Sequence, residues 1–382
     1  MVVGVNDPWF CTQSGVGMSR TQFDELLPRL VRDPGVKQAQ WDHAASKGVY
    51  MMPLLEGPNI SALSWAVKHP AFSGVVELSN EPFWNSISAS SWVKTWGPVI
   101  DQIDALYPSV QLLAPIDDWS TARTSGPGTV PWTQQLFAAR PSLRQEIDGW
   151  AIHPYFDGDP AQALQHLQNG INALKANGVP NPRMFCTEMG WSRQNTSEAN
   201  QAAFAQSFLT GAALKPEVAA VLWYQDNDTE RPTDAGWNRD AGFGLYKEPA
   251  SGNWSDTWTK AQVWSVWKKA ITASPTGDFR AQTTQTATVT VSLDGTSKSV
   301  PITVTSTALA AVRAVQAVNA TGGTQMKLHP KVKAGAGVGG VGALVAWIVG
   351  QYGVPVPPEV AVAVNTIVAF VASYLTSSTP TP

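Results

Sequence analysis

The sequence has little cysteine and no long run of one charge sign. Only Cys11 and Cys186 occur in 382 residues, too few for a disulfide framework, and neither lies in a spacing typical of zinc sites. The 26 Lys and Arg residues are balanced by 29 Asp and Glu residues, so the sequence does not indicate the basic surface of a nucleic-acid-binding protein. We therefore expect no metal, no cofactor and no nucleic-acid partner.

The chain also begins without the basic start and apolar run of a secretory signal, since its first residues read MVVGVNDPWF. Export by that route is not expected. Tryptophan, by contrast, is abundant, and sixteen of the 17 tryptophans lie before residue 268. Flat apolar rings can stack on sugars, although core packing is the ordinary role of most such side chains.

The first 272 residues alternate short β-branched runs with amphipathic stretches, a pattern typical of parallel strands joined by helices. Several expected helices begin at Ser or Asp and end before Gly or Pro; they cover residues 19–30, 88–108, 159–178 and 197–214. The expected strands cover residues 2–6, 49–55, 74–80, 109–115, 147–153, 183–188 and 219–225. This pattern predicts an α/β fold of the (β/α)₈ TIM-barrel type.

A closed barrel needs eight strands, and the pattern supplies seven. The gap lies between residues 7 and 48, where RLVRDPGVK is short and charged for an inner strand. We therefore expect one N-terminal strand to be degenerate or missing.

The composition changes after residue 272. Residues 273–330 contain two Thr/Ser-rich alternating runs around an Asp-Gly turn, which predicts a β-hairpin connector, followed by a short helix over 308–320. Residues 331–382 contain two apolar stretches of about 17 residues around a Pro-rich turn, the lower limit for crossing a bilayer. They predict a hydrophobic helical hairpin with a polar tail, inserted in a membrane or buried in a protein assembly.

Two glutamates stand at the ends of expected strands. Glu81 lies in ELSNEPFW (77–84) and Glu188 in MFCTEMGW (184–191). In a barrel the carboxyl ends of all strands meet at one face, so these side chains can converge although they are far apart in sequence. Two carboxylates at short range can cleave a glycosidic bond, one as acid and one as nucleophile. Cys186 is expected to share a face with Glu188 and to be buried.

These motifs resemble the large clan of retaining glycosidases that includes cellulases, xylanases and β-xylosidases. The resemblance covers about residues 1–270 and implies that Glu81 is the acid/base, that Glu188 is the nucleophile and that Asn80 holds the sugar hydroxyl next to the cleaved bond. Glu77, four positions before Glu81, also fits the clan. The partners of the reaction would be a polysaccharide and water.

The same resemblance assigns residues at two further strand ends. WAIHPYFDG places His153 and Tyr155 where the clan hydrogen-bonds the nucleophile or the sugar, and VLWYQDND places Trp223 where the clan has a platform under the sugar ring. Loop residues just past strand ends are further candidates for substrate binding, each with a plain loop role as the alternative. They are Trp84 and Trp191, with Asn59, Asp226 and Asn227, and at lower priority Asn6 and Glu56.

The C-terminal region resembles hydrophobic hairpins encoded by phages of actinobacteria in tail, lysis and small membrane proteins. This resemblance implies a virion tail or lysis component at the host cell envelope, which self-associates or binds other tail proteins and contacts membrane through residues 331–375. The function expected from both resemblances is a retaining glycoside hydrolase acting on an envelope polysaccharide. The alternative is a non-catalytic tail or adhesion protein that binds envelope sugars through its barrel.

Overall fold

The chain forms two compact units, residues 1–280 and 281–382, each described by itself. The computed structural model describes residues 1–6, 19–83, 85–116, 131–156, 158–225, 242–247 and 258–275, and the backbone of 284–293 and 296–305. The short helix and hydrophobic hairpin expected after residue 306 lie outside these ranges. Within them, no helix has the length and apolar composition needed to cross a membrane.

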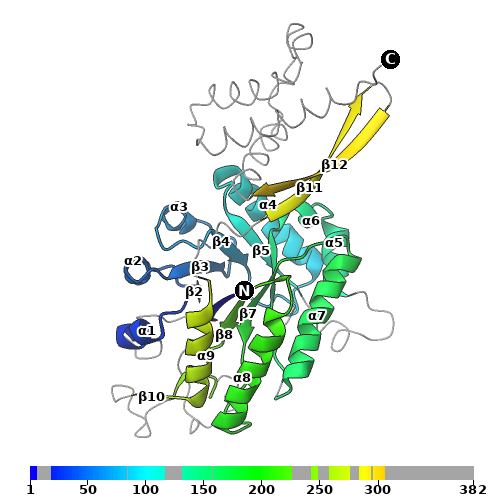
Figure 1. Cartoon of the computed structure of the whole chain (residues 1–382). Helices are drawn as coiled ribbons and strands as arrows, with labels where there is room; N and C mark the ends of the chain where they lie inside the picture. The colour runs from blue at the N-terminus through cyan, green and yellow to red at the C-terminus, as the bar shows by residue number, and fades with distance from the viewer. Residues whose placement is uncertain are drawn as a thin grey trace, which may run out of the picture. The chain divides into compact units, whose positions relative to one another are not determined.

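Eight parallel strands close into a barrel in chain order, which confirms the expected fold class (Figure 1). Each strand pairs with the next, and β1 pairs with β8 through Val2–Ala220 to Val5–Trp223, which closes the ring. The strands are β1 (Val2–Asn6), β2 (Leu30–Asp33), β3 (Tyr50–Leu55), β4 (Val75–Leu78), β5 (Gln111–Pro115), β6 (Gly149–Ile152), β7 (Met184–Met189) and β8 (Val218–Trp223).

The strand missing from the sequence pattern is β2, which lies within RLVRDPGVK. Of the two expected alternatives, the structure has the degenerate strand, short and charged, and the barrel is closed. The four residues of β2 are all buried, and they alternate between two environments. Leu30 packs inside the barrel with the other strands, whereas Val31 packs in the outer layer against the helices. The charged residues are accommodated by partners: Arg32 pairs with two carboxylates, and Asp33 accepts hydrogen bonds from Trp41 Nε1 and two backbone N–H groups.

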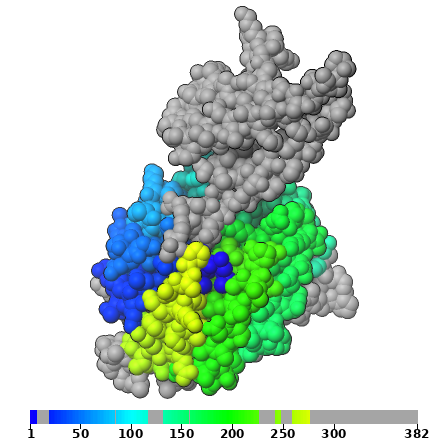
Figure 2. All heavy atoms as spheres, viewed as in Figure 1, coloured from blue at the N-terminus to red at the C-terminus, as the bar shows by residue number. Residues whose placement is uncertain are grey.

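Helices cover the outside of the barrel. They are α1 (Arg20–Leu26), α2 (Gln38–Ser46), α3 (Leu63–Ala66), α4 (Ala89–Leu106), α5 (Trp132–Ala139), α6 (Leu143–Glu146), α7 (Pro160–Ala176), α8 (Glu198–Ala213) and α9 (Gln262–Ala273). The polar caps expected from sequence are present, because Ser19, Ser88, Asp159 and Ser197 each accept a hydrogen bond from the first turn of their helix. Figure 2 shows α9 (yellow) lying between the N-terminal elements (blue) and α8 (green).

The barrel interior has an apolar floor. A separate cluster of side chains fills it, contributed by seven strands: Val2, Leu30, Met52, Val75, Leu113, Phe185, Ala220 and Leu222. Side chains two positions further along a strand point to the same side. The next inward positions after Leu30, Val75 and Phe185 are therefore Arg32, Glu77 and Thr187, all polar and nearly inaccessible. A polar layer thus lies directly above the floor, toward the carboxyl ends of the strands.

Two small sheets complete the described structure. Strands β9 (Tyr246–Lys247) and β10 (Thr259–Lys260) pair antiparallel in the first unit. Strands β11 (Thr284–Leu293) and β12 (Thr296–Thr305) pair antiparallel, from the Thr284–Thr305 pair to the Leu293–Thr296 pair. The two Thr/Ser-rich runs thus form the expected hairpin, and its role as a connector stays a prediction.

Candidate active site

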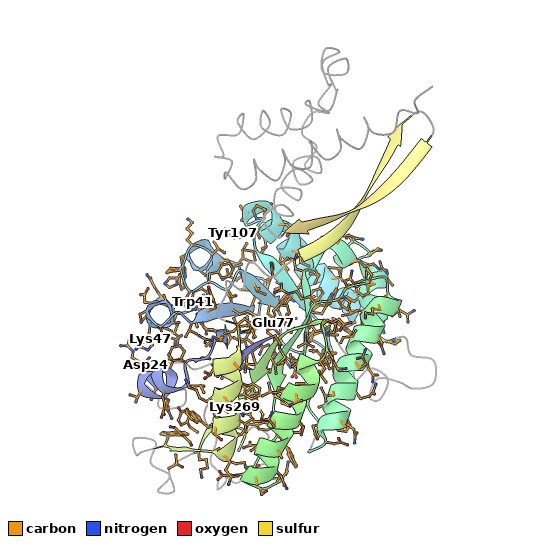
Figure 3. The ribbon with its side chains drawn as sticks, in the orientation of Figure 1. Asp24, Trp41, Lys47, Glu77, Tyr107 and Lys269 are labelled. Atoms are coloured by element: carbon orange, nitrogen blue, oxygen red, sulfur yellow. The ribbon has the colours of Figure 1, made fainter. Side chains whose placement is uncertain are left out.

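Arg32 is the centre of the polar layer. Its Nε and Nη2 donate to the two oxygens of Glu77 at 2.6 and 2.9 Å, and its Nη1 donates to Glu188 Oε1 at 2.5 Å. Nη2 also donates to Asn80 Oδ1 at 2.8 Å. Burial opposes a charged guanidinium, but the negative charges of Glu77 and Glu188 outweigh it and raise the pKa of Arg32 above its ordinary value. Figure 3 shows Glu77 among the strands at the middle of the barrel.

Glu188 is held by donors on both of its oxygens. Arg32 donates to Oε1, and the Tyr155 hydroxyl donates to Oε2 at 3.0 Å. The Nδ1 atom of His153 lies 3.6 Å from Oε2. Hydrogen bonds to a charged partner are shorter and stronger than neutral ones, so Arg32 and Tyr155 fix the position of this carboxyl group. Because of its burial and the nearby carboxylates, led by Glu188, the pKa of Tyr155 is raised well above its ordinary value, so Tyr155 remains a donor.

Glu81 approaches the same point from the loop after β4. The backbone turns sharply there, with positive φ at Ser79 (60°) and Glu81 (40°). Ser79 is tied to α4, since its Oγ accepts from Trp92 Nε1 at 2.8 Å. The Glu81 side chain is 16% exposed, and its Oε1 lies 2.8 Å from His153 Nδ1. Positive φ is uncommon for a residue with a Cβ atom. This unusual turn after β4 directs the Glu81 side chain toward Glu188.

His153 lies between the two glutamates. Its Nδ1 contacts Glu81, and its Nε2 lies 3.0 Å from Thr187 Oγ1. Burial favours the neutral ring, but the charge of Glu188 and the hydrogen bond and charge of Glu81 outweigh it, so the pKa of His153 is raised above its usual value. The two carboxylates thus stabilise the protonated, imidazolium form of His153.

The three side chains are close together. One carboxylate oxygen of Glu81, one of Glu188 and a ring nitrogen of His153 all lie within 4.8 Å of one another. That spacing would also suit a metal ion. Both His153 nitrogens are engaged in hydrogen bonds, however, and Arg32 already supplies a positive charge to Glu188. The described groups around this point thus already supply hydrogen bonds and a positive charge to the three side chains.

Most residues expected at the site are brought together. Asn80, Glu81, His153, Tyr155 and Glu188 surround one point at the carboxyl ends of β4, β6 and β7. Beside them, a cavity of about 330 Å³ is lined by residues after β3 and β4 and from α4, among them Glu56, Asn80, Asn85 and Thr95. Asn80 therefore lines the cavity while its Oδ1 accepts a hydrogen bond from Arg32.

Trp223 is not part of this site, which corrects the expectation of a sugar platform. Its side chain is fully buried, its Nε1 donates to the Phe243 carbonyl at 2.8 Å, and its ring lies 5.1 Å from that of Trp267 on α9. Since Ala220 and Leu222 point into the barrel, Trp223 must point outward. The next residue, Tyr224, is half-buried, with its ring 6.1 Å from that of Tyr155.

Cys186 is buried, as expected, but it does not share a face with Glu188. It packs in the outer layer against the helices, whereas Phe185 and Thr187 face inward. The pairing of β7 with β8 shifts between Cys186 and Met189, so strict alternation fails there and both Thr187 and Glu188 reach the site.

The remaining candidates divide between described and undescribed positions. Trp191 is half-buried, and its ring packs on Phe204 and against Gly158. Among the described residues, its indole N–H makes no hydrogen bond to Glu81, His153 or Glu188. Asn59 is exposed and accepts from the Ser61 backbone. Trp84, Asp226 and Asn227 lie outside the described residues.

Sequence reasoning missed Arg32, Thr187 and Tyr224. Only a weak indication in the sequence places Arg32 in the site. Arg32 follows the apolar residues Leu30 and Val31, and an arginine in a buried strand needs carboxylate partners. Thr187 and Tyr224 would have been found by counting inward positions from the apolar floor, two residues at a time.

No known family model matches the sequence, and no curated protein sequence matches it. Among solved structures, the fold is similar to that of a family 39 glycoside hydrolase from Bacteroides cellulosilyticus WH2, with a TM-score of 0.50, 14% identity and coverage of 77% of this chain and 68% of that one. Family 128 endo-β-1,3-glucanases from Amycolatopsis mediterranei and Pseudomonas viridiflava each give a TM-score of 0.48 and 17% identity over 70% of this chain, and 99% and 96% of theirs. The first likeness shows a shared (β/α)₈ fold.

Proposed function

We propose that the barrel unit is a retaining glycoside hydrolase that cleaves a polysaccharide, with Glu188 as nucleophile and Glu81 as acid/base. The observation that carries this proposal is the pair of carboxylates within 4.8 Å of each other in unlike surroundings. Glu188 is held by Arg32 and the Tyr155 hydroxyl, whereas Glu81 is more exposed and contacts a histidine that can exchange a proton. Unlike surroundings are what separate the roles of two catalytic carboxyl groups.

The reaction follows from these positions. Glu188 attacks the anomeric carbon while Glu81 gives its proton to the glycosidic oxygen, so the bond to the leaving sugar breaks as an ester to Glu188 forms. Water then attacks the same carbon, gives its proton to Glu81 and releases the Glu188 carboxylate. Asn80, which lines the adjoining cavity, would hold a sugar hydroxyl.

The spacing favours retention over inversion. Retaining enzymes have carboxyl groups about 5–5.5 Å apart, whereas inverting enzymes need about 6.5–9.5 Å to admit a water. One carboxylate oxygen of Glu81 lies within 4.8 Å of one of Glu188, and this closeness supports the retaining assignment.

The test is hydrolysis of a panel of aryl glycosides, β-glucans, xylans and bacterial envelope polysaccharides, with product configuration followed by NMR. Wild-type protein is expected to release product with retained configuration, and Glu188→Gln to lose at least about 10³-fold in rate while still binding the substrate. Glu217→Gln is the matched control, because that carboxylate pairs with Lys175 on the surface. An inverted product would overturn the assignment, and sugar binding without turnover on any substrate would favour the adhesion protein instead.

We further propose an envelope polysaccharide as substrate and a virion tail or lysis assembly as the setting. The support is the apolar composition of residues 331–375, which suits burial in a membrane or in an assembly with other chains. The barrel that would present the active site is closed, because β2 completes the ring of eight strands.

A further inference from the structure

His153 belongs to a continuous chain of hydrogen bonds that runs from the polar layer to Glu81. Thr187 Oγ1 donates to Glu77 Oε1 at 3.1 Å, and His153 Nε2 lies 3.0 Å from the same Oγ1. On the other side of the ring, His153 Nδ1 lies 2.8 Å from Glu81 Oε1. The four groups come from β4, β7, the end of β6 and the loop after β4.

The direction of each bond can be assigned by counting protons. Glu77 is paired with Arg32 through both oxygens, so it is a carboxylate that only accepts. The Thr187 hydroxyl has one proton, and that proton is donated to Glu77. Thr187 Oγ1 can therefore only accept from His153, and Nε2 must carry a hydrogen.

We propose that Glu77 and Thr187 act as positioning residues that keep the hydrogen on His153 Nε2, so that Nδ1 and Glu81 Oε1 share a single exchangeable proton. The pair then has two states: a carboxylate with an imidazolium that donates from Nδ1, and a carboxylic acid that donates to a neutral Nδ1. No third group is needed to move the proton between them.

This inference deepens the proposed function and, for its catalytic part, rests on it. In the free enzyme the proton resides on Nδ1. It moves to Glu81 Oε1, where an O–H bond forms as the N–H bond breaks, and from there to the glycosidic oxygen as the bond to the leaving sugar breaks. In the second step water returns a proton to Glu81, and the pair is restored. His153 is thus the proton store of the acid/base.

The charged and titratable groups around His153, within the described residues, agree with this role. Glu81 contacts Nδ1, Glu188 Oε2 lies 3.6 Å from it, and the ring of Tyr155 lies 6.4 Å away and edge-on. The Arg32 guanidinium opposes the two carboxylates with its positive charge. Two carboxylates against one cation favour a protonated Nδ1 in the resting site.

The test compares wild type, Thr187→Val and Thr187→Ser by NMR of ¹⁵N-labelled histidine. The chain has only five histidines, and His153→Asn identifies the signals of His153. Between about pH 5 and 9, a range that spans histidine titration, wild type is expected to keep its Nε2 proton while Nδ1 titrates. Thr187→Val, similar in shape but without the hydroxyl, should populate both neutral tautomers, and Thr187→Ser should restore the wild-type pattern.

Leaving-group dependence supplies the activity readout. Thr187→Val is expected to lower kcat/KM about tenfold or more on glycosides with a poor leaving group, because those need an acid. Dinitrophenyl glycosides, which leave without a proton, should change by no more than about twofold, and Thr187→Ser should recover most of the loss.

A neutral wild-type His153 with its hydrogen on Nδ1 would overturn the proposal, and this measurement needs no variant of Thr187 to fold. Equal losses on both classes of leaving group would overturn its catalytic part. If wild type cleaves no glycoside, the proposed function fails by itself, and the NMR titration still decides where His153 carries its proton.

Discussion

Arg32 joins the stability of the barrel to the chemistry of the site. It is 1% exposed and pairs with two carboxylates that come from β4 and β7. Removing one partner of a buried ion pair leaves an uncompensated charge in a low-dielectric surrounding, which costs far more than losing a surface pair. The same guanidinium donates to Glu188 Oε1, so the residue that joins β2 to β4 and β7 also positions the proposed nucleophile.

Replacing Arg32 with Met is therefore expected to destabilise the protein by about 3–5 kcal/mol at neutral pH. Urea unfolding followed by tryptophan fluorescence measures the loss. Arg140→Met is the matched control, since Arg140 also joins two carboxylates, Asp101 and Glu146, but at the surface. It should cost no more than about 1 kcal/mol. Equal losses of unfolding free energy in the two variants would show that the buried ion pairs of Arg32 stabilise the protein no more than surface pairs do.

His153 predicts how stability depends on pH. Its pKa is raised in the folded protein, although burial opposes this, because of Glu188 and Glu81. The folded state therefore binds the proton more tightly than the unfolded state does. The resulting stabilisation is fully present below the unfolded value of 6.5 and is lost as pH rises through the higher folded value.

The free energy of unfolding of wild type, relative to that of His153→Asn, is therefore expected to fall as pH rises from about 6.5 through the folded pKa of His153. Urea midpoints of both proteins, measured at half-unit pH steps with a constant m-value, give the difference. A difference that stays constant with pH would show that His153 does not bind its proton more tightly in the folded state.

At the scale of the element, strand register decides which side chains meet in the barrel. Gly149 on β6 faces the interior, where a Cβ atom would lie 2.7 Å from Leu113 Cδ2 and 2.7 Å from Phe185 Cε2. Both neighbours belong to the buried apolar floor, so a Cβ atom at Gly149 would force one of them to shift. The absence of a side chain at Gly149 lets Phe185 fill the barrel, and the polar layer rests on that packing.

Gly149→Ala is expected to destabilise the protein by about 1–3 kcal/mol through overpacking. Gly57→Ala is the control, because a Cβ there would meet no atom within 4 Å. Thermal unfolding of the two variants by circular dichroism should separate them clearly. A Gly149→Ala protein as stable as Gly57→Ala would mean that the floor can shift to accept a methyl group.

At the scale of the whole molecule, the catalytic group and the barrel core both lie within residues 1–280. Such a unit has its own hydrophobic core and a closed sheet without exposed edges, which are the properties of a chain that folds alone. Residues 331–382, by contrast, carry the apolar stretches that predict membrane contact or self-association.

A chain ending at residue 280 is therefore expected to unfold cooperatively and to keep the glycosidase activity of the full chain within about twofold, since no residue of the proposed site is removed. The full chain, but not a chain ending at residue 330, should float with liposomes or elute as an oligomer. Light scattering on a sizing column and liposome flotation make these measurements. A full chain that stays monomeric and off liposomes would refute the role assigned to the tail.

The sequence by itself determined the repeated strand-and-helix order, the barrel class and the two glutamates. These follow from local information, because β-branched runs, polar caps and a polar residue at a strand end are all readable within one short segment. His153, Tyr155 and Asn80 were reachable in the same way, since each stands just past a buried strand.

Only the tertiary structure decided that LVRD is a strand, that Trp223 faces outward while Tyr224 lies beside Tyr155, and that Thr187 joins His153 to Glu77. Arg32 can be buried only because Glu77 and Glu188, 45 and 156 residues later, come to meet it. A shift of one residue in the register of β8 would turn Trp223 toward the site and Tyr224 away from it. Long-range pairing and register are properties of the closed sheet, and no short segment of the chain contains them.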